Sequence, residues 1–230
     1  MSRAVHIAIM VPINNTTFEQ EVLGWLPQDS KVTVLKIPRG PGLLNPETLP
    51  AYKSQALELA EKLRGTDVDV VAYGCTAAGF ILGPQGDLDL RGELEAIVGK
   101  PVITTAGAMV ECLNSNGVND IALITPYLED VNTQLKNFLS NGGIRISRFD
   151  SFYAKGVHDL GNITSQQVAK KARDIFDDKC GGLFIACAQL PTQSILEELR
   201  NEFKVPVFSS NYSTTILAQK LLESKTNNFG

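Results

Sequence analysis

The feature that most constrains this chain is a short apolar run that ends in a cysteine and occurs once in each half. Val70–Tyr73 leads through Gly74 into Cys75, and Leu183–Ala186 leads directly into Cys187. Short apolar runs of this kind are typical of strands that are buried on both faces of a parallel sheet. Because ligands of open α/β sheets bind at the carboxyl ends of the strands, both cysteines are candidates for chemistry. Either one alone could also be a core residue, since free cysteine is often buried.

Two further pairs of segments repeat in the same order. Ile7–Pro12 matches Ile121–Pro126, and the Lys-Pro-Val segment at 100–102 matches Lys204–Val207, with offsets between 105 and 114 positions. This repetition indicates an internal duplication. Strand patterns alternate with helix patterns throughout, so we predict two similar parallel α/β halves. A pseudo-two-fold between the halves would bring Cys75 and Cys187 to opposite sides of one cleft.

The predicted domain boundary lies near residue 116. We expect residues 1–115 together with 210–230 to form the first domain, and residues 116–209 to form the second. The closing helix, from about Ser213 to Leu222, is assigned to the first domain because its helices otherwise leave one flank of the sheet bare.

Composition excludes several classes of function. The content of 43% hydrophobic and 20% charged residues is ordinary for a globular protein, and a net charge of −4 gives no basic surface for nucleic acid. No apolar run is long enough to span a membrane, and no signal peptide is recognisable. Four scattered cysteines suggest a reducing compartment, so we expect a cytoplasmic location. Glycine-rich nucleotide loops are absent and the two histidines are far apart, so we expect neither a cofactor nor a metal.

Polar residues follow several of the predicted strands. Asn15 and Thr16 precede a helix, where Asn15 could cap it, Thr16 could form a capping box with Glu19, or both could bind an anion. Tyr127 follows a strand of the second half and could donate its hydroxyl to an acid or pack at the rim. Asn162 is either a turn residue or a ligand donor.

Three other segments have simpler interpretations. The proline- and glycine-rich stretch 38–46 reads as a mobile loop that could cover a site, and the stretch 79–89 reads as a second loop. Cys112 falls among core-facing positions of a helix and is interpreted as structural.

Taken together, Val11–Glu19, Tyr73–Thr76, Thr125–Tyr127 and Cys187–Pro191 resemble the aspartate/glutamate racemase superfamily, and within it the maleate cis–trans isomerase branch. The resemblance covers nearly the whole chain and implies two flavodoxin-like, three-layer halves with the site between them. Arylmalonate decarboxylases share the fold and the tyrosine loop but lack the first cysteine. Amino-acid and hydantoin racemases keep both cysteines.

The resemblance also implies a mechanism without a cofactor. Cys75 would add to the double bond of maleate to give a succinyl-cysteine, and Cys187 would exchange the proton, so that fumarate is released after rotation. The dicarboxylate would be bound by residues of both halves, namely Asn15, Thr16, Thr76, Tyr127, Asn162 and Ala188. No arginine is clearly placed by the sequence to clamp a carboxylate. The protein would be a homodimer or a higher homo-oligomer.

Two departures from the family pattern and three alternatives remain. Ile13 and Asn14 stand where maleate isomerases usually carry two serines, and the segment after Cys75 is not typical of any one branch. The main alternative is a racemase of aspartate, glutamate or hydantoins that uses the two thiols for proton transfer. An arylmalonate-type decarboxylase, or a module whose cysteines pair reversibly, is a further alternative.

Overall fold

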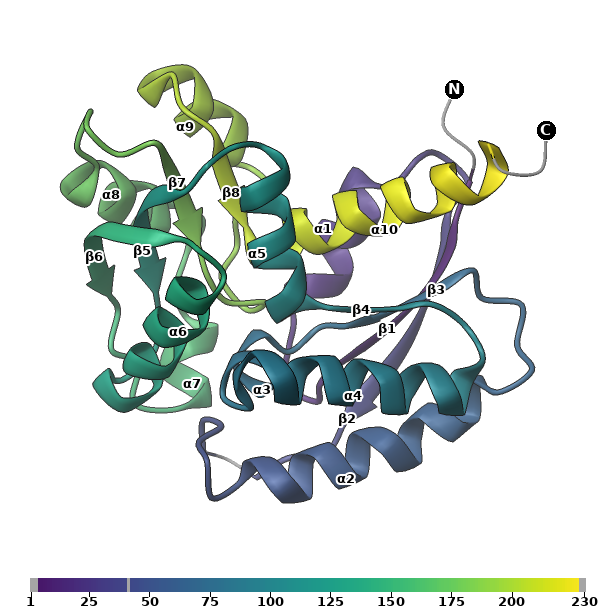
Figure 1. The fold of residues 1–230 in the computed structure, drawn as a ribbon. Coiled ribbons are helices and arrows are strands. Elements are labelled where there is room, and N and C mark those ends of the chain that lie inside the picture. Colours follow the sequence, from purple (N-terminus) through teal and green to yellow (C-terminus); the bar gives the residue numbers. More distant parts are fainter. Residues whose placement is uncertain (1–3, 41, 228–230) are drawn as a thin grey trace.

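The computed structural model describes residues 4–40 and 42–227, and its core is two four-stranded sheets whose strands are all parallel (Figure 1). The first sheet has the order β2-β1-β3-β4 and the second the order β6-β5-β7-β8. The strands of the first sheet are β1 (His6–Pro12), β2 (Lys31–Ile37), β3 (Val70–Tyr73) and β4 (Val102–Thr104). Those of the second are β5 (Asp120–Thr125), β6 (Arg145–Ser151), β7 (Gly182–Ile185) and β8 (Val207–Ser209).

The strand order is the same in both halves, with β5, β6, β7 and β8 in the places of β1, β2, β3 and β4. This shared order confirms the predicted fold class of two similar parallel α/β halves. The central strands β3, β5 and β7 are buried along their whole length, as their apolar sequences require. The edge strands β2 and β6 carry more polar residues and are partly exposed, which is how proteins commonly protect an open sheet edge.

Helices flank the two sheets. In the first half these are α1 (Phe18–Trp25), α2 (Leu49–Ala60), the short 3-10 helix η1 (Glu61–Leu63), α3 (Thr76–Phe80), α4 (Gly83–Val98) and α5 (Thr105–Ser115). In the second they are α6 (Glu129–Asn141), α7 (Val157–Gly161), α8 (Ser165–Ile175), α9 (Leu196–Phe203) and α10 (Ser210–Asn227).

Alternating side chains of β1 illustrate the three layers of the first half. Ala8 and Met10 belong to a large apolar cluster that includes α2 and α4, whereas Ile7 and Ile9 belong to a second cluster with α1 and α10. The period of two residues along a strand therefore directs the apolar side chains to both faces of the sheet, and helices cover each face (Figure 1).

Helix α10 follows β8 without a loop but lies over the first half. It packs against α1 and α5, where the Gln219 amide donates to the Trp25 carbonyl at 2.9 Å and the rings of Trp25 and Tyr212 meet edge to face. Helix α5 follows β4 in the same way, so α5 and α10 have equivalent positions in the order of elements along the two halves. The division into residues 1–115 plus 210–230 and residues 116–209 remains our proposal for the domains.

Two segments that were interpreted as loops are helical. The stretch 79–89 contains the end of α3 and the start of α4. The polar stretch 159–164, whose sequence also predicts a loop, begins within α7, which ends at Gly161. In the first stretch, Gly79 is required by close packing, because a Cβ there would lie 2.5 Å from the Cβ of Ala106 and from Oδ1 of Asp87. Gly83 has a φ of 72° and begins α4.

The start of α1 settles the choice between the two capping residues. Asn15 Oδ1 accepts from the backbone N–H groups of Thr17 and Phe18, at 3.1 and 2.9 Å, so Asn15 supplies the cap. The predicted capping box of Thr16 with Glu19 is wrong, since the Thr16 hydroxyl instead accepts from the side-chain amide of Gln189.

None of the helices within the described ranges is long and apolar enough to cross a membrane. Across the same residues, His, Cys, Asp and Glu side chains nowhere gather in a group that could hold a metal ion.

Candidate active site

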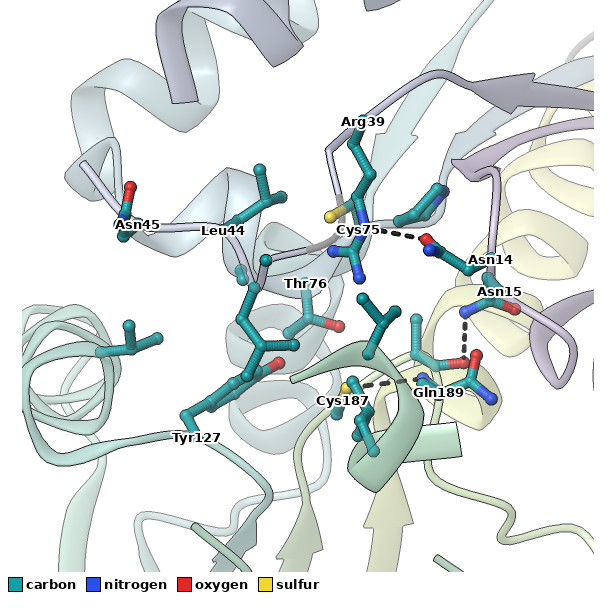
Figure 2. A pocket seen from close by; sticks show the side chains of 18 of the residues that line it. Asn14, Asn15, Arg39, Leu44, Asn45, Cys75, Thr76, Tyr127, Cys187 and Gln189 are labelled. Carbon is teal, nitrogen blue, oxygen red and sulfur yellow. Dashed lines mark hydrogen bonds between the residues drawn. The ribbon is translucent and has the colours of Figure 1, made fainter. Parts of the chain in front are cut away.

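A cavity of about 310 Å³ lies between the carboxyl ends of the two sheets, and both halves contribute to its wall (Figure 2). Cys75 follows β3 and Cys187 follows β7, and both thiols line this cavity. The other lining residues are Pro12, Asn14, Asn15, Arg39, Gly42, Leu43, Leu44, Asn45, Gly74, Thr76, Ala77, Tyr127, Leu128, Val131, Lys155, Val157, Leu160, Ala188 and Gln189.

Cys75 is buried where β3 passes into α3. Its surface is only 6% exposed, and burial raises the pKa of its thiol above the ordinary value. The backbone N–H of Ala78 and the hydroxyl of Tyr52 oppose this effect, because both stabilise the thiolate. Cys187 has the reverse influence: a negative charge on its sulfur raises the pKa of Cys75, so the two thiols are close enough to interact.

Cys187 has a matching environment in the second half. Burial raises the pKa of its thiol, and hydrogen bonds from the backbone N–H groups of Gln189 and Leu190 lower it. The Gln189 N–H lies 3.4 Å from the sulfur (Figure 2). Each cysteine is therefore a buried thiol whose anion is supported by backbone donors of the turn that follows it.

Arg39 is the cation that acts on both thiols. It follows β2, is half-buried, and lowers the pKa of Cys75 and of Cys187. Its Nε donates to Oδ1 of Asn14 at 2.8 Å, which holds the guanidinium over the cavity (Figure 2). This residue supplies the arginine that the sequence alone did not place.

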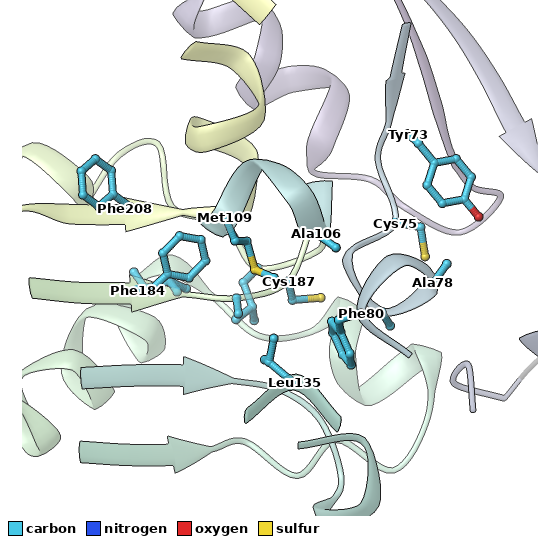
Figure 3. Close-up of a cluster of buried hydrophobic side chains, with 14 of the residues drawn as sticks. Tyr73, Cys75, Ala78, Phe80, Ala106, Met109, Leu135, Phe184, Cys187 and Phe208 are labelled. Atoms are coloured by element: carbon cyan, nitrogen blue, oxygen red, sulfur yellow. The ribbon is translucent and has the colours of Figure 1, made fainter. Parts of the chain in front are cut away.

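Two buried hydroxyls in the cavity wall have no well-formed hydrogen bond in the described residues. These are Oγ1 of Thr76 and the Tyr127 hydroxyl, although the latter lies close enough to the Cys187 thiol to lower its pKa. The Tyr127 ring is fixed by Phe80 of α3, with 5.4 Å between ring centroids. Phe80 belongs to a buried apolar cluster that also contains Cys75 and Cys187 (Figure 3). Buried hydroxyls are normally satisfied, so both are available to an acid bound in the cavity.

A network of hydrogen bonds ties the two halves together beside the cavity. Asn15 Nδ2 donates to the Ala188 carbonyl at 3.0 Å, and the Thr17 hydroxyl donates to the Gln189 carbonyl at 2.9 Å. The Gln189 side chain accepts from the Thr16 N–H and donates to its hydroxyl. These contacts fix the loop after β1 against the loop that contains Cys187.

Glu21 extends this network into the core. The carboxylate is 4% exposed and accepts from the backbone N–H groups of Thr192 and Gln193, the Thr192 hydroxyl and the Asn211 amide. A buried carboxylate that is satisfied in this way holds α1, the loop after Cys187 and the start of α10 in one arrangement.

Most of the residues predicted for the site line the cavity, and two do not. Cys75, Cys187, Asn15, Thr76, Tyr127 and Ala188 are all in its wall. Thr16 lies outside the wall and its hydroxyl accepts from the Gln189 side chain, while the exposed Asn162 contacts His158.

The cavity wall also contains residues that were not predicted for the site from the sequence. These are Asn14, Arg39, Lys155, Gln189 and the leucines at 43 and 44. The proposal that stretch 38–46 covers the site is supported for Arg39 and residues 42–45, which line the cavity, while residue 41 lies outside the described residues.

The sequence profile of the arylmalonate decarboxylase family matches residues 42–228, which is most of the chain. The chain belongs to this family. The match confirms the resemblance to the superfamily that contains these decarboxylases and the maleate isomerases, and with it the prediction of an enzyme.

Individual relatives include both activities. The chain is 23% identical to the maleate isomerase of Geobacillus stearothermophilus, over 98% of this chain and 95% of that protein. It is 25% identical to the arylmalonate decarboxylase of Bordetella bronchiseptica, over 75% and 72% of the two chains. The fold also matches the Nocardia farcinica maleate cis–trans isomerase with a covalently bound succinylcysteine intermediate. That match has a TM-score of 0.87 and 22% identity, and it covers 96% of this chain and 94% of the other.

Proposed function

We propose that this protein is a cofactor-independent isomerase that converts maleate to fumarate through a covalent succinyl-cysteine. The observation that carries the proposal is the presence of two thiols, one from each half, in the wall of a single cavity whose arginine acts on both. The relatives named maleate isomerase, and the succinylcysteine trapped in one of them, support the same chemistry.

In the proposed reaction, Cys75 enters as the thiolate and adds to C2 of maleate. The electron pair of the double bond moves to C3, where the Cys187 thiol supplies a proton, so C2–C3 becomes a single bond that can rotate. Cys187 then takes a proton back from C3, the double bond re-forms and the C2–S bond breaks. Fumarate leaves and both thiols return to their starting states.

The rest of the cavity wall is suited to this sequence. Thr76 and Tyr127 offer hydroxyls to the carboxylates, because neither has a well-formed partner in the described residues. Asn15 is already occupied by Ala188 and the helix cap, so we assign it a positioning role for the loop that contains Cys187. The acid/base role of Cys187 is supported by Tyr127, which lowers the pKa of its thiol.

The adduct itself tests the proposal. Cys187→Ser protein is incubated with maleate, and the peptides are analysed by mass spectrometry. We expect one maleic acid to be added to the Cys75 peptide, while Cys112→Ser protein, altered at a cysteine outside the cavity, isomerises maleate at the normal rate. Absence of the adduct together with absence of fumarate in the wild type would remove the proposal.

Proton NMR of the wild type distinguishes the isomerase from the racemase alternative. In deuterated buffer, proton NMR of aspartate, glutamate or a hydantoin would show loss of the α-proton signal without any adduct. Release of carbon dioxide from an arylmalonate would instead indicate the decarboxylase. We expect neither reaction to compete with the isomerisation of maleate.

A further inference from the structure

The cavity wall contains two cationic side chains and no acidic one among the described residues. The cations are Arg39 and Lys155. Neither forms an ion pair within the described part of the chain, where the ion pairs all involve other residues. A cleft lined by one sign of charge attracts the opposite sign, so this cavity is matched to a ligand with two negative charges.

The two cations come from equivalent places in the two halves. Arg39 follows β2 by two positions, and Lys155 follows β6 by four. Both strands lie at the edge of their sheets, next to β1 and β5. The cysteines likewise follow the equivalent strands β3 and β7. Each half of the protein therefore contributes one thiol and one cation to the same cavity.

The cations differ in how closely they approach the thiols. Arg39 is half-buried, is held by Asn14 and lowers the pKa of both cysteines, which places it beside the reacting centre. With Nε engaged, its terminal N–H groups are free to bind a carboxylate in a planar, two-point arrangement. Lys155 is exposed and offers a point charge at the rim of the cavity.

We propose that Arg39 and Lys155 are the specificity-determining residues for a dicarboxylate. Arg39 binds the carboxylate next to the carbon that Cys75 attacks, and Lys155 binds the second carboxylate. The protein then selects four-carbon dianions over the corresponding half-amides. This inference rests on the proposed function for the identity of the acid, but it concerns recognition and not the chemical step.

Binding of unreactive acids tests the assignment. Succinate has both carboxylates and no double bond, and succinamate replaces one carboxylate by an amide. Dissociation constants are measured as protection of Cys75 from alkylation by iodoacetamide, with peptide mapping. The variants are Arg39→Gln, Arg39→Lys, Lys155→Gln and, as a control, Lys170→Gln, whose side chain lies on α8 and pairs with Asp174.

We expect the wild type to bind succinate about fivefold more tightly than succinamate, the size of effect for an exposed charge pair. Lys155→Gln should remove this preference by weakening succinate alone. Arg39→Gln should weaken both ligands about tenfold or more, because both place a carboxylate on the arginine. Arg39→Gln should also move the pH profile of Cys75 alkylation to higher pH, whereas Arg39→Lys should leave that profile near the wild type but bind both acids poorly. The Lys170 variant should match the wild type.

An equal effect of Lys155→Gln on the two ligands, or no effect, would overturn the assignment, as would unchanged binding in Arg39→Gln. The binding result can be distinguished from the outcome of the isomerase proposal. If the wild type prefers succinate to succinamate but does not convert maleate, the proposed function is wrong and the roles of the two cations stand. If the wild type isomerises maleate but binds succinate and succinamate equally well, the roles of Arg39 and Lys155 are wrong and the proposed function stands.

Discussion

The side-chain amide of Asn15 donates to the carbonyl of Ala188 at 3.0 Å, across 173 positions of the sequence. The same side chain caps α1 through its oxygen, so a single residue fixes the first helix of one half and the cysteine loop of the other. Because Ala188 directly follows Cys187, the position of the second thiol depends on a residue of the first half.

Substitutions at Asn15 should separate these two roles. Asn15→Ala removes both and should lower the free energy of unfolding by about 1–3 kcal/mol. Asn15→Asp keeps the cap but places an oxygen against the Ala188 carbonyl, so we expect a smaller loss of stability and a clear loss of maleate turnover. Urea denaturation and a fumarate assay provide the two measurements. Wild-type turnover in Asn15→Asp would show that the contact with Ala188 is dispensable.

Loss of the buried carboxylate of Glu21 should destabilise the protein. Glu21→Gln leaves an amide N–H₂ group facing donors that now bond to a carboxylate, and hydrogen bonds to charged groups are worth about 1.5–3 kcal/mol each. We expect a loss of at least about 2 kcal/mol in the free energy of unfolding. Glu19→Gln, on the same helix but without such contacts, is the matched control and should unfold like the wild type.

Turnover should increase with pH above neutrality. Burial raises the pKa of both cavity thiols. The reaction begins with Cys75 as the thiolate and Cys187 as the thiol, so turnover should rise as Cys75 ionises and fall again at the higher pH at which Cys187 also ionises. In Cys75→Ser protein, the pH dependence of Cys187 alkylation isolates the second thiol. Tyr127→Phe should shift that dependence to higher pH, since the hydroxyl lowers the pKa of Cys187. A profile unaffected by the loss of the hydroxyl would contradict this role for Tyr127.

Asp87 should make stability depend on pH between about 4 and 6. Burial raises its pKa to about 6 from 3.8, although the Thr104 hydroxyl donates to its carboxylate at 2.7 Å. The folded state then binds the proton more tightly than the unfolded state, so this residue lowers stability as pH rises through that window. From pH 4 to pH 7, Asp87→Asn should gain up to about 3 kcal/mol relative to the wild type in urea denaturation. Asp89→Asn, which alters an exposed carboxylate on the same helix, should show no such gain.

The strands and both cysteines were predictable because their signals are local. Both cysteine strands are short apolar runs with small residues after them. The helices in the stretch 79–89 were not predictable, because Gly79 is required by a neighbour distant in sequence. Gly79 meets Ala106, and no local pattern distinguishes that requirement from a turn.

The two cations of the cavity also could not be predicted from the sequence. Arg39 and Lys155 are single charged residues in loops that follow edge strands, and such residues usually face solvent. Only the arrangement of the two halves turns both of them toward the cysteines' cavity. Asn162 was the reverse case: it is a polar residue near the predicted site, but its side-chain amide contacts the His158 ring and it does not line the cavity.

The direct passage from β8 into α10 has a consequence for how the protein could be divided. Helix α10 follows the last strand of the second half, but it packs against α1 of the first half and against α5, which follows the last strand of that half. The second half therefore supplies a helix that covers part of the first. A break introduced near residue 117 should yield fragments that are poorly folded alone but reassemble when they are mixed.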